Sequence, residues 1–307
     1  MNFTHINYKG NKSFRILNIY ERLNKGEMLS KEKLADDFGV SMKTVQRDID
    51  DLRAYLAETH FTESETAIRY NKAKNCYYLI RFEREWLTNE EALALCKIIL
   101  ESRAFCKEEL SRLIEKLIMQ ISPAERPVAE KIIRNEYFHY VPLRHEKELL
   151  TPIWELSQHI AKQEMITFRY RRQDGKQGLK TVKPVSIMFS EFYFYLIAFS
   201  SDDSKNNPIV YRIDRISDVK RTGENFTVDY RNKFSEGEFR KRVQFMYSGE
   251  LRTVKFEYSG VLEAILDRLP TAKILKEENG VYTISAETYG DGIYMWLRAQ
   301  GDKARVL

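Results

Sequence analysis

Between Ser41 and Arg47 the chain gathers side chains that can donate hydrogen bonds to a nucleic acid. Lysine, arginine, glutamine, serine and threonine reach phosphate oxygens, and several of them also recognise base edges. The N-terminus of a helix adds a partial positive charge and free backbone N–H groups. We therefore expect the first half of a helix that begins here to enter the major groove of duplex DNA, with contacts from Ser41, Lys43, Thr44, Gln46 and Arg47.

Three aspartates, Asp48, Asp50 and Asp51, follow in the second half of the same helix. Carboxylates repel a phosphate backbone, so we expect only the N-terminal half of the helix to approach DNA. An ordinary helical hairpin with a solvated polar face is the alternative interpretation of this stretch.

The residues before this helix predict a partner helix and a tight turn. Ser30 can cap a first helix, whose apolar residues Leu34, Ala35 and Phe38 recur on one face. Gly39 stands where that helix must end and the chain must reverse, because glycine adopts positive φ without a Cβ clash. Together these features predict a helix-turn-helix.

The second helix needs an apolar face to hold its polar face outward. Ser41 can cap it, and four apolar residues, Met42, Val45, Ile49 and Leu52, recur at the helical period. A further helix over residues 13–25 is expected to complete the domain. Its packing residues are predicted to be Phe14, Leu17, Ile19, Tyr20 and Leu23.

A β-hairpin is predicted directly after these helices. Residues 67–79 carry two β-favouring ends around a turn between Asn71 and Asn75. Such a hairpin would be a wing, and three cations at or near its tip suit contacts to a flanking phosphate or the minor groove. These cations are Arg69, Lys72 and Lys74. A solvated loop with ordinary lysines is the alternative.

The sequence from Phe14 to Leu52 resembles the winged helix-turn-helix of DeoR-type bacterial regulators. The segment SMKTVQRDIDDL carries the resemblance, with the family's pattern falling on Ser41, Lys43, Thr44, Val45, Arg47 and Asp48. The resemblance implies binding to an operator but says nothing about the operator's sequence.

Composition places the chain among globular, multidomain proteins. It has 307 residues, 43% of them hydrophobic, and a net charge of +5; a chain of this length exceeds one ordinary core. No apolar run approaches the roughly 18–20 residues that span a bilayer, and the N-terminal residues lack the apolar core of a secretory signal. Three cysteines without a CxxC pair predict neither a disulfide framework nor a zinc site. We expect a cytoplasmic protein.

A helical block is predicted between residues 88 and 134. Thr88 can cap its first helix, Pro123 is expected to end the second, and a short third helix is predicted over Val128–Ile133. We expect this block to join two subunits, because a helix-turn-helix reads two half-sites as a dimer. Core packing within one chain is the alternative.

Beyond this block the hydrophobic period changes from 3.6 to 2. Thr151-Pro152 predicts a helix start, with threonine as the cap. Consecutive strands with short turns then predict a small antiparallel barrel. The predicted strands are Met165–Tyr170, Lys180–Met188, Phe192–Phe199 and Ile209–Ile216.

This region resembles the WYL domain, an SH3-like or Sm-like barrel found behind helix-turn-helix domains in bacterial regulators. The resemblance rests on Lys183-Pro184, on FYLIA from Phe194, and on YRIDRI from Tyr211. Phe194 stands where the defining tripeptide has tryptophan, so an indole N–H donor is lost. Residues 252–307 look like the extension that often follows WYL domains, with a helix at Val261–Arg268.

The resemblance implies an effector domain that binds a nucleic acid, in some members single-stranded DNA. Residues 161–221 hold twelve Lys and Arg against seven Asp and Glu, a field that attracts anions. Carrying the family's motif over, we expect effector contacts from Tyr170, Lys183, Tyr195, Arg212 and Arg215. The alternatives are an unoccupied basic surface, a core role for Tyr195 or Leu196, and an internal ion pair between Arg215 and Asp214.

The sequence as a whole predicts an α+β multidomain protein. Its predicted parts are a winged helix-turn-helix domain (residues 1–82), a helical linker and dimerisation region (83–145), a WYL effector domain (146–235) and a small α/β extension (236–307). No catalytic motif, cofactor or metal site is identified. We expect a homodimeric transcription factor that binds double-stranded DNA, responds to an effector ligand and has no membrane association. A small-metabolite-responsive repressor and a nucleic-acid-processing enzyme are the alternatives.

Overall fold

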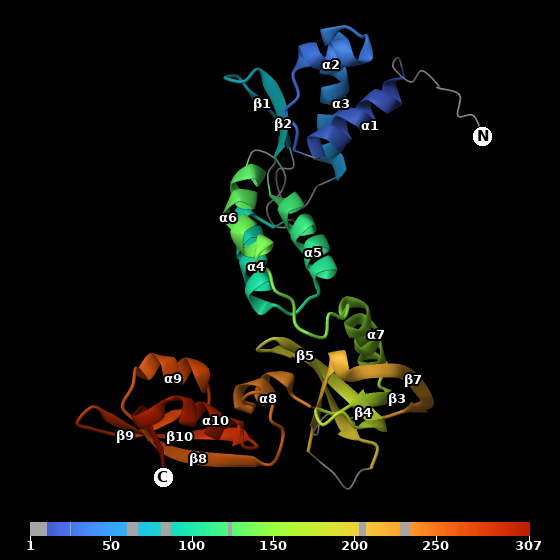
Figure 1. Cartoon of the computed structure of the whole chain (residues 1–307). Helices are drawn as coiled ribbons and strands as arrows, with labels where there is room; N and C mark the ends of the chain where they lie inside the picture. Colours follow the sequence, from blue (N-terminus) through green and yellow to red (C-terminus); the bar gives the residue numbers. More distant parts are fainter. Residues whose placement is uncertain are drawn as a thin grey trace. The chain divides into compact units, whose positions relative to one another are not determined.

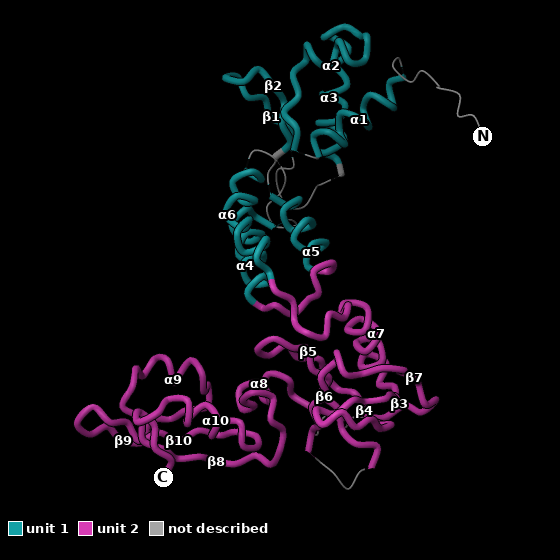
Figure 2. Tube along the Cα trace, in the orientation of Figure 1, with its two compact units in different colours: residues 1–101, 110–140 teal, residues 102–109, 141–307 magenta. Residues whose placement is uncertain are grey.

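The structure is a computed structural model in which the chain folds into two compact units (Figure 2). It describes residues 11–24, 26–59, 67–80, 87–121, 125–202, 207–227 and 234–307. One unit comprises residues 1–101 and 110–140, and the other residues 102–109 and 141–307. Within the described ranges, no helix combines the length and apolarity that crossing a membrane requires.

The first unit begins with the expected helix-turn-helix (Figure 1). Its helices are α1 (Lys12–Asn24), α2 (Lys31–Phe38) and α3 (Met42–Thr59). Ser30 Oγ accepts the Lys33 N–H and Ser41 Oγ accepts the Thr44 N–H, both at 3.2 Å, so the two predicted caps are confirmed. Gly39 ends α2 with φ of 64°, which confirms the left-handed turn.

The buried core of these helices differs from the predicted core at one residue of α3 and at two residues of α1. Val45, Ile49 and Leu52 are buried as expected, but Met42 is 52% exposed because it lies in the first turn, beyond the edge of the core. On α1, Phe14 and Leu17 are also exposed, so neither belongs to the buried core for which they were predicted. Arg15 of the same helix is buried instead. Its charge can be buried because the guanidinium pairs with the carboxylate of Asp48 on α3.

The wing is present as predicted. Strands β1 (Ala67–Asn71) and β2 (Cys76–Ile80) pair antiparallel, with Asn71 opposite Cys76. The side chain of Asn71 accepts the backbone N–H of Lys74, and Asn75 has positive φ, so asparagines form the turn.

Three helices form the helical block: α4 (Asn89–Ser102), α5 (Lys107–Gln120) and α6 (Arg126–Phe138). Thr88 and Glu91 exchange side chain–backbone hydrogen bonds at the start of α4, a capping box that confirms the predicted cap. The third helix is twice as long as predicted: it begins two residues earlier, at Arg126, and runs past Ile133 to Phe138, where half-buried Tyr137 continues the face of buried Ala129 and Ile133. Pro123 lies outside the described residues.

The second unit contains a five-stranded antiparallel sheet in the order β6-β5-β4-β3-β7. Its strands are β3 (Glu164–Arg171), β4 (Gln177–Ser190), β5 (Tyr193–Ser200), β6 (Ile209–Arg212) and β7 (Ile216–Asn225). The predicted single strand Ile209–Ile216 was wrong, because a 3₁₀ turn, η2 (Ile213–Arg215), divides it. Since these three residues connect the two edge strands of the sheet, the sheet curls as an SH3-like barrel does.

Helices cover both faces of the curled sheet (Figure 1). Helix α7 (Leu150–Ala161) packs on β3 and β4 around Leu156, Ile166 and Phe168. Helix α8 (Glu236–Arg242) covers the other face with Phe239. The predicted cap of α7 by Thr151 was wrong: the helix begins at Leu150, and the buried carboxylate of Glu109 accepts the N–H groups of Leu149 and Leu150 instead.

The C-terminal part adds a four-stranded sheet in the order β11-β8-β10-β9. Its elements are β8 (Leu251–Tyr258), α9 (Leu262–Arg268), β9 (Lys273–Glu278), β10 (Val281–Tyr289), α10 (Gly292–Ala299), η4 (Gly301–Lys303) and β11 (Ala304–Val306). The two helices share a core with alternate residues of β8 and β10, including Phe256 and Ile284. The short strand β11 was not predicted.

Candidate nucleic-acid interface and basic pocket

The N-terminal end of α3 presents its cations to solvent. Lys43 and Arg47 are exposed, one helical turn apart, and Thr44 lies half-buried between them. The hydroxyls of Ser41 and Thr44 lie 3.0 Å apart at the helix start. The free N–H groups of this turn and the two cations therefore form one face that can meet a phosphate backbone or a base edge.

The aspartates of α3 do not act as a block of exposed negative charge. Asp48 is 1% exposed and forms a two-point ion pair with Arg15, at 2.8 and 3.3 Å, so the expectation that it repels phosphates was wrong. Asp50 and Asp51 are exposed, but Arg53 pairs with Asp50 at 3.1 Å and Lys12 with Asp51 at 2.7 Å. Each of the three aspartates of α3 thus has a cationic partner.

The three predicted wing cations are exposed. Arg69 lies on β1 opposite Tyr78, and Lys72 and Lys74 lie in the turn between the strands. All three are therefore accessible to a ligand, and nothing on the wing itself neutralises Lys72 or Lys74 among the described residues.

Gln46, the remaining predicted contact residue of α3, is half-buried and hydrogen-bonded within the protein. Its Oε1 accepts the Tyr77 hydroxyl of the wing at 2.8 Å and the Lys31 ammonium of α2 at 3.2 Å. Its Nε2 donates to Asp50 Oδ1 at 3.0 Å. The amide therefore connects α3 with both α2 and the wing.

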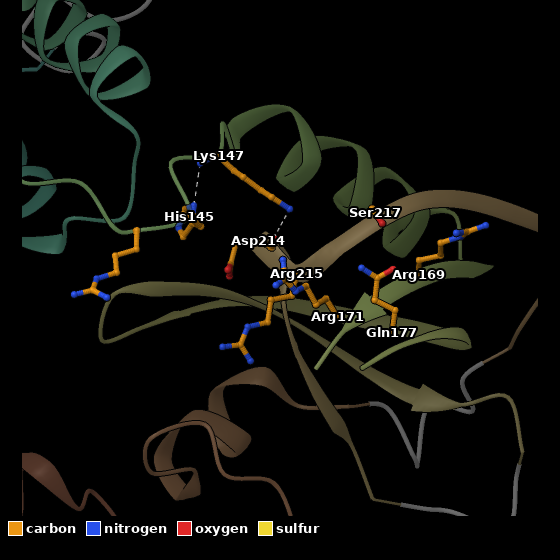
Figure 3. Close-up of a pocket in the computed structure, with 9 residues that line it drawn as sticks. His145, Lys147, Arg169, Arg171, Gln177, Asp214, Arg215 and Ser217 are labelled. Atoms are coloured by element: carbon orange, nitrogen blue, oxygen red, sulfur yellow. Dashed lines mark hydrogen bonds between the residues drawn. The ribbon is translucent and has the colours of Figure 1, made fainter. Parts of the chain in front are cut away.

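The second unit contains a pocket of about 400 Å³ beside the curled sheet (Figure 3). The loop before α7, strands β3 and β4, and the segment from η2 to β7 contribute its lining. Its lining residues are Arg144, His145, Lys147, Arg169, Arg171, Gln177, Asp214, Arg215 and Ser217. Five permanent cations against one carboxylate give this pocket a strongly positive field.

Several of the pocket's cations keep their charge available. Lys147 donates to the backbone oxygen of Asp214 at 2.6 Å, an uncharged acceptor, and Figure 3 shows its side chain extending from the loop toward η2. Arg169 approaches Asp218 at 3.4 Å where both are exposed, a geometry that contributes little free energy. Within the described part of the chain, no ion pair involves Arg171 or Arg215.

His145 is a hydrogen-bond donor held at the same pocket. Its Nδ1 accepts the backbone N–H of Lys147 at 3.0 Å, so the proton of the neutral ring lies on Nε2. Nε2 is buried and has no partner among the described residues. Burial lowers the pKa of His145, while Asp214 acts in the opposite direction. The ring is therefore neutral near pH 7.

Of the five residues predicted to contact an effector, only Arg215 lines this pocket. The residues carried over from the family's motif do not include the other four cations of the lining, Arg144, Lys147, Arg169 and Arg171. Arg169 and Arg171 alternate on β3, and such a spacing places two side chains on one face of a strand, so this pair could have been found. Arg144 and Lys147 come from an irregular loop, for which the sequence has no comparable pattern.

Arg212 has a structural environment rather than an open one. It pairs with Asp214 at 2.8 and 3.0 Å, and its guanidinium lies 3.4 Å from the centroid of the Tyr193 ring. Burial opposes its charge, but Asp214 outweighs that effect and raises the pKa of Arg212. An internal ion pair between Arg215 and Asp214 was the alternative interpretation of the sequence. Asp214 does form an internal ion pair, but its partner is Arg212.

The other predicted effector residues also lie outside the pocket lining. Tyr170 packs against Tyr211, with ring centroids 5.0 Å apart, and its hydroxyl accepts the Arg212 N–H. Tyr195 is half-buried against the cluster beneath α8, and burial raises its pKa to about 12. Lys183 is half-buried on β4.

Comparison with known proteins identifies two domains in this chain. A family model described as an HTH domain matches residues 15–61, and one described as a WYL domain matches residues 153–221. A search of curated proteins finds no match.

Two solved structures are similar over most of the chain. One is Proteasome accessory factor B/C (PafBC) of Arthrobacter aurescens, with 16% identity, 96% coverage of this chain and a TM-score of 0.30. This chain spans 45% of the length of that protein. The other is a CRISPR Cas-related protein with 14% identity and a TM-score of 0.36, for which 100% of this chain and 83% of that chain are covered. The family matches show that this α+β multidomain chain contains an N-terminal HTH domain and, further along, a WYL domain.

Proposed function

We propose that this protein is a DNA-binding transcriptional regulator whose affinity for its operator is controlled by an anionic effector in the basic pocket. The effector is a phosphate-bearing nucleic acid, with single-stranded DNA as the first candidate. The observation that carries the proposal is the pocket itself, where five cations meet one carboxylate in the same chain as an HTH domain.

The DNA contacts follow from the exposed cations of the first unit. The N-terminal half of α3 occupies the major groove, and the wing contacts a flanking phosphate or the minor groove. Two copies of the chain read two half-sites, with the helical block α4–α6 as the interface between them. The proposed contact residues are Ser41, Lys43, Thr44, Arg47, Arg69, Lys72 and Lys74.

Phosphate is the effector chemistry that the pocket fits best. Arginine pairs with phosphate through two parallel N–H···O bonds, and four arginines line the pocket. A chain of phosphates can engage several of them together, whereas a single carboxylate satisfies one. To control the operator, the effector must bind one conformation of the regulator more tightly than the other.

Selection of bound sequences from random duplex DNA, with and without short single strands, tests the proposal. We expect one enriched duplex motif with two half-sites and a change in its affinity when single strands are added. If each subunit neutralises about four phosphates, log K should fall with log salt at a slope near −7 for the dimer. A slope near zero, or no enriched motif, would contradict the proposal.

A small anionic metabolite is the second candidate effector. The pocket's volume of about 400 Å³ lies in the range of sites for single small molecules. Thermal unfolding distinguishes the two candidates, because a ligand that binds only the folded state raises the melting temperature. Stabilisation by nucleotides or diphosphates, but not by oligonucleotides, would favour the metabolite.

A further inference from the structure

The amide of Gln46 has a fixed orientation in the free protein. Its oxygen accepts hydrogen bonds from Tyr77 and Lys31, and its nitrogen donates to Asp50. An amide oxygen has two lone pairs, so both are used. One N–H of the amide is left for any outside partner.

This arrangement opposes a role in reading bases. Glutamine recognises adenine with both ends of its amide, accepting from N6 and donating to N7. The oxygen of Gln46 could serve adenine only by giving up the Tyr77 hydroxyl or the Lys31 ammonium. Because Tyr77 is 4% exposed, its released hydroxyl would be left buried without its acceptor.

The same network reaches the wing at a second point. Arg53 of α3 donates to the backbone oxygen of Ile68 on β1 at 3.0 Å, and its guanidinium lies 5.3 Å from the centroid of the Tyr77 ring. Arg53 also pairs with Asp50, the acceptor of the Gln46 amide. Gln46 and Arg53 thus join α3 to both strands of the wing, Gln46 to β2 and Arg53 to β1.

We propose that Gln46 is a positioning residue, which fixes the wing and its cations relative to the DNA-reading face of α3. This inference rests on the proposed function and replaces the expectation that Gln46 contacts DNA directly. A wing held in place before binding loses less conformational freedom when Lys72 and Lys74 meet phosphates. Breaking the link therefore lowers the affinity for any duplex and leaves the preferred sequence unchanged.

A thermodynamic cycle with the wing cations tests this role. Full-length variants Gln46→Ala, Tyr77→Phe and their combination are titrated against the selected duplex, each also in a Lys72→Ala/Lys74→Ala background. We expect each single change to weaken binding by roughly fivefold, the factor that corresponds to a hydrogen bond of about 1 kcal/mol. The combination should cost no more than Gln46→Ala alone, and all three effects should vanish in the background without wing cations.

Tyr78→Phe is the matched control, because Tyr78 lies beside Tyr77 on β2 and its hydroxyl has no hydrogen-bond partner among the described residues. It should bind as the unmodified protein does. Thermal unfolding of each variant separates a loss of binding from a loss of folding.

Two outcomes would overturn the inference and are distinguishable from one another. If Gln46→Ala relaxes the preference at one base pair while Tyr77→Phe changes nothing, Gln46 reads a base and only the positioning role fails. If the unmodified protein binds no duplex, the proposed function fails and the positioning role fails with it.

Discussion

The two cationic surfaces of this protein differ in how their side chains are held. In the helix-turn-helix, polar residues behind the exposed cations are tied to partners within the domain, as Arg15 is to Asp48 and Gln46 to Tyr77. In the basic pocket, Arg171 and Arg215 have no ion-pair partner within the described residues. The side chains of the first surface are therefore already held in position for a rigid ligand. The cations of the second surface lack negative partners, which an anionic ligand would supply.

This difference has a thermodynamic consequence. Duplex DNA is a rigid ligand, so a protein surface already in place loses little freedom on binding. Like charges gathered in a pocket instead repel one another, and an anion that binds there relieves the repulsion in the folded state alone. We therefore expect loss of a buried ion pair in the first region to act mainly on folding, and loss of a pocket cation in the second to act mainly on ligand affinity.

The largest expected effect is the loss of the buried ion pair between Arg15 of α1 and Asp48 of α3. Asp48→Ala leaves the guanidinium of Arg15, which is 5% exposed, without its carboxylate. Removing one partner of a buried pair costs about 3–5 kcal/mol. Denaturant unfolding followed by circular dichroism measures this change in the free energy of unfolding.

A double variant separates the charge from the packing. Arg15→Met with Asp48→Leu removes both charges together and should recover most of the stability, because apolar replacements of buried pairs are often neutral. A single Asp48→Ala variant as stable as the unmodified protein would show that this region does not depend on its internal pairs.

The next effect concerns the loop that supplies part of the pocket. Glu109 is 1% exposed and accepts the N–H groups of Leu149 and Leu150 at 2.8–2.9 Å, directly after the loop that holds Lys147. Glu109→Ala should lower the free energy of unfolding by about 2–4 kcal/mol, because the buried N–H of Leu149 and the partly buried N–H of Leu150 lose their acceptor. Glu109→Gln keeps an acceptor oxygen and should lose less. Equal losses in both variants would show that the charge, not the hydrogen bonding, matters here.

Local features of this fold were predictable from the sequence, whereas the long-range partners of Glu109 and Asp48 were not. Caps, turns and amphipathic helices are local, so Ser30, Gly39 and the wing turn at Asn71 were predicted correctly. Glu109 caps a helix 40 residues further along the chain, and Asp48 meets Arg15 across 33 residues. Partners at such separations are set by tertiary packing, which local patterns do not contain.

The pocket shows the same limit in the prediction of function. Its basic character was predicted from the excess of Lys and Arg over residues 161–221. Of the residues chosen by family motif, Arg212 pairs with Asp214 and Tyr195 packs beneath α8, and neither lines the pocket. The actual lining includes the loop before α7, which the barrel motif does not cover.

The third prediction concerns ligand affinity without a change in folding. Arg215→Ala should weaken binding of a short single strand by roughly tenfold to a hundredfold, as expected for a charged hydrogen bond of about 1.5–3 kcal/mol. Isothermal titration calorimetry measures the affinity, and the melting temperature of the free protein should not change. Lys220→Ala is the control, because Lys220 is exposed on β7, the strand that follows Arg215, but does not line the pocket. Equal losses in both variants would mean that the anion binds the surface and not the pocket.

The smallest expected effect is a pH dependence that belongs to the pocket alone. Because burial lowers the pKa of His145 below its ordinary value near 6.5, its free folded form favours the neutral ring. As pH falls below 6.5, the unfolded chain binds this proton first, so His145 makes the free protein less stable. A bound anion favours the protonated ring, so effector affinity should rise as pH falls from 7.5 to 5.5, by at most tenfold per pH unit. His145→Asn keeps an acceptor for the Lys147 N–H but cannot titrate, and its affinity should lose this rise; an unchanged slope in the variant would assign the proton to another group.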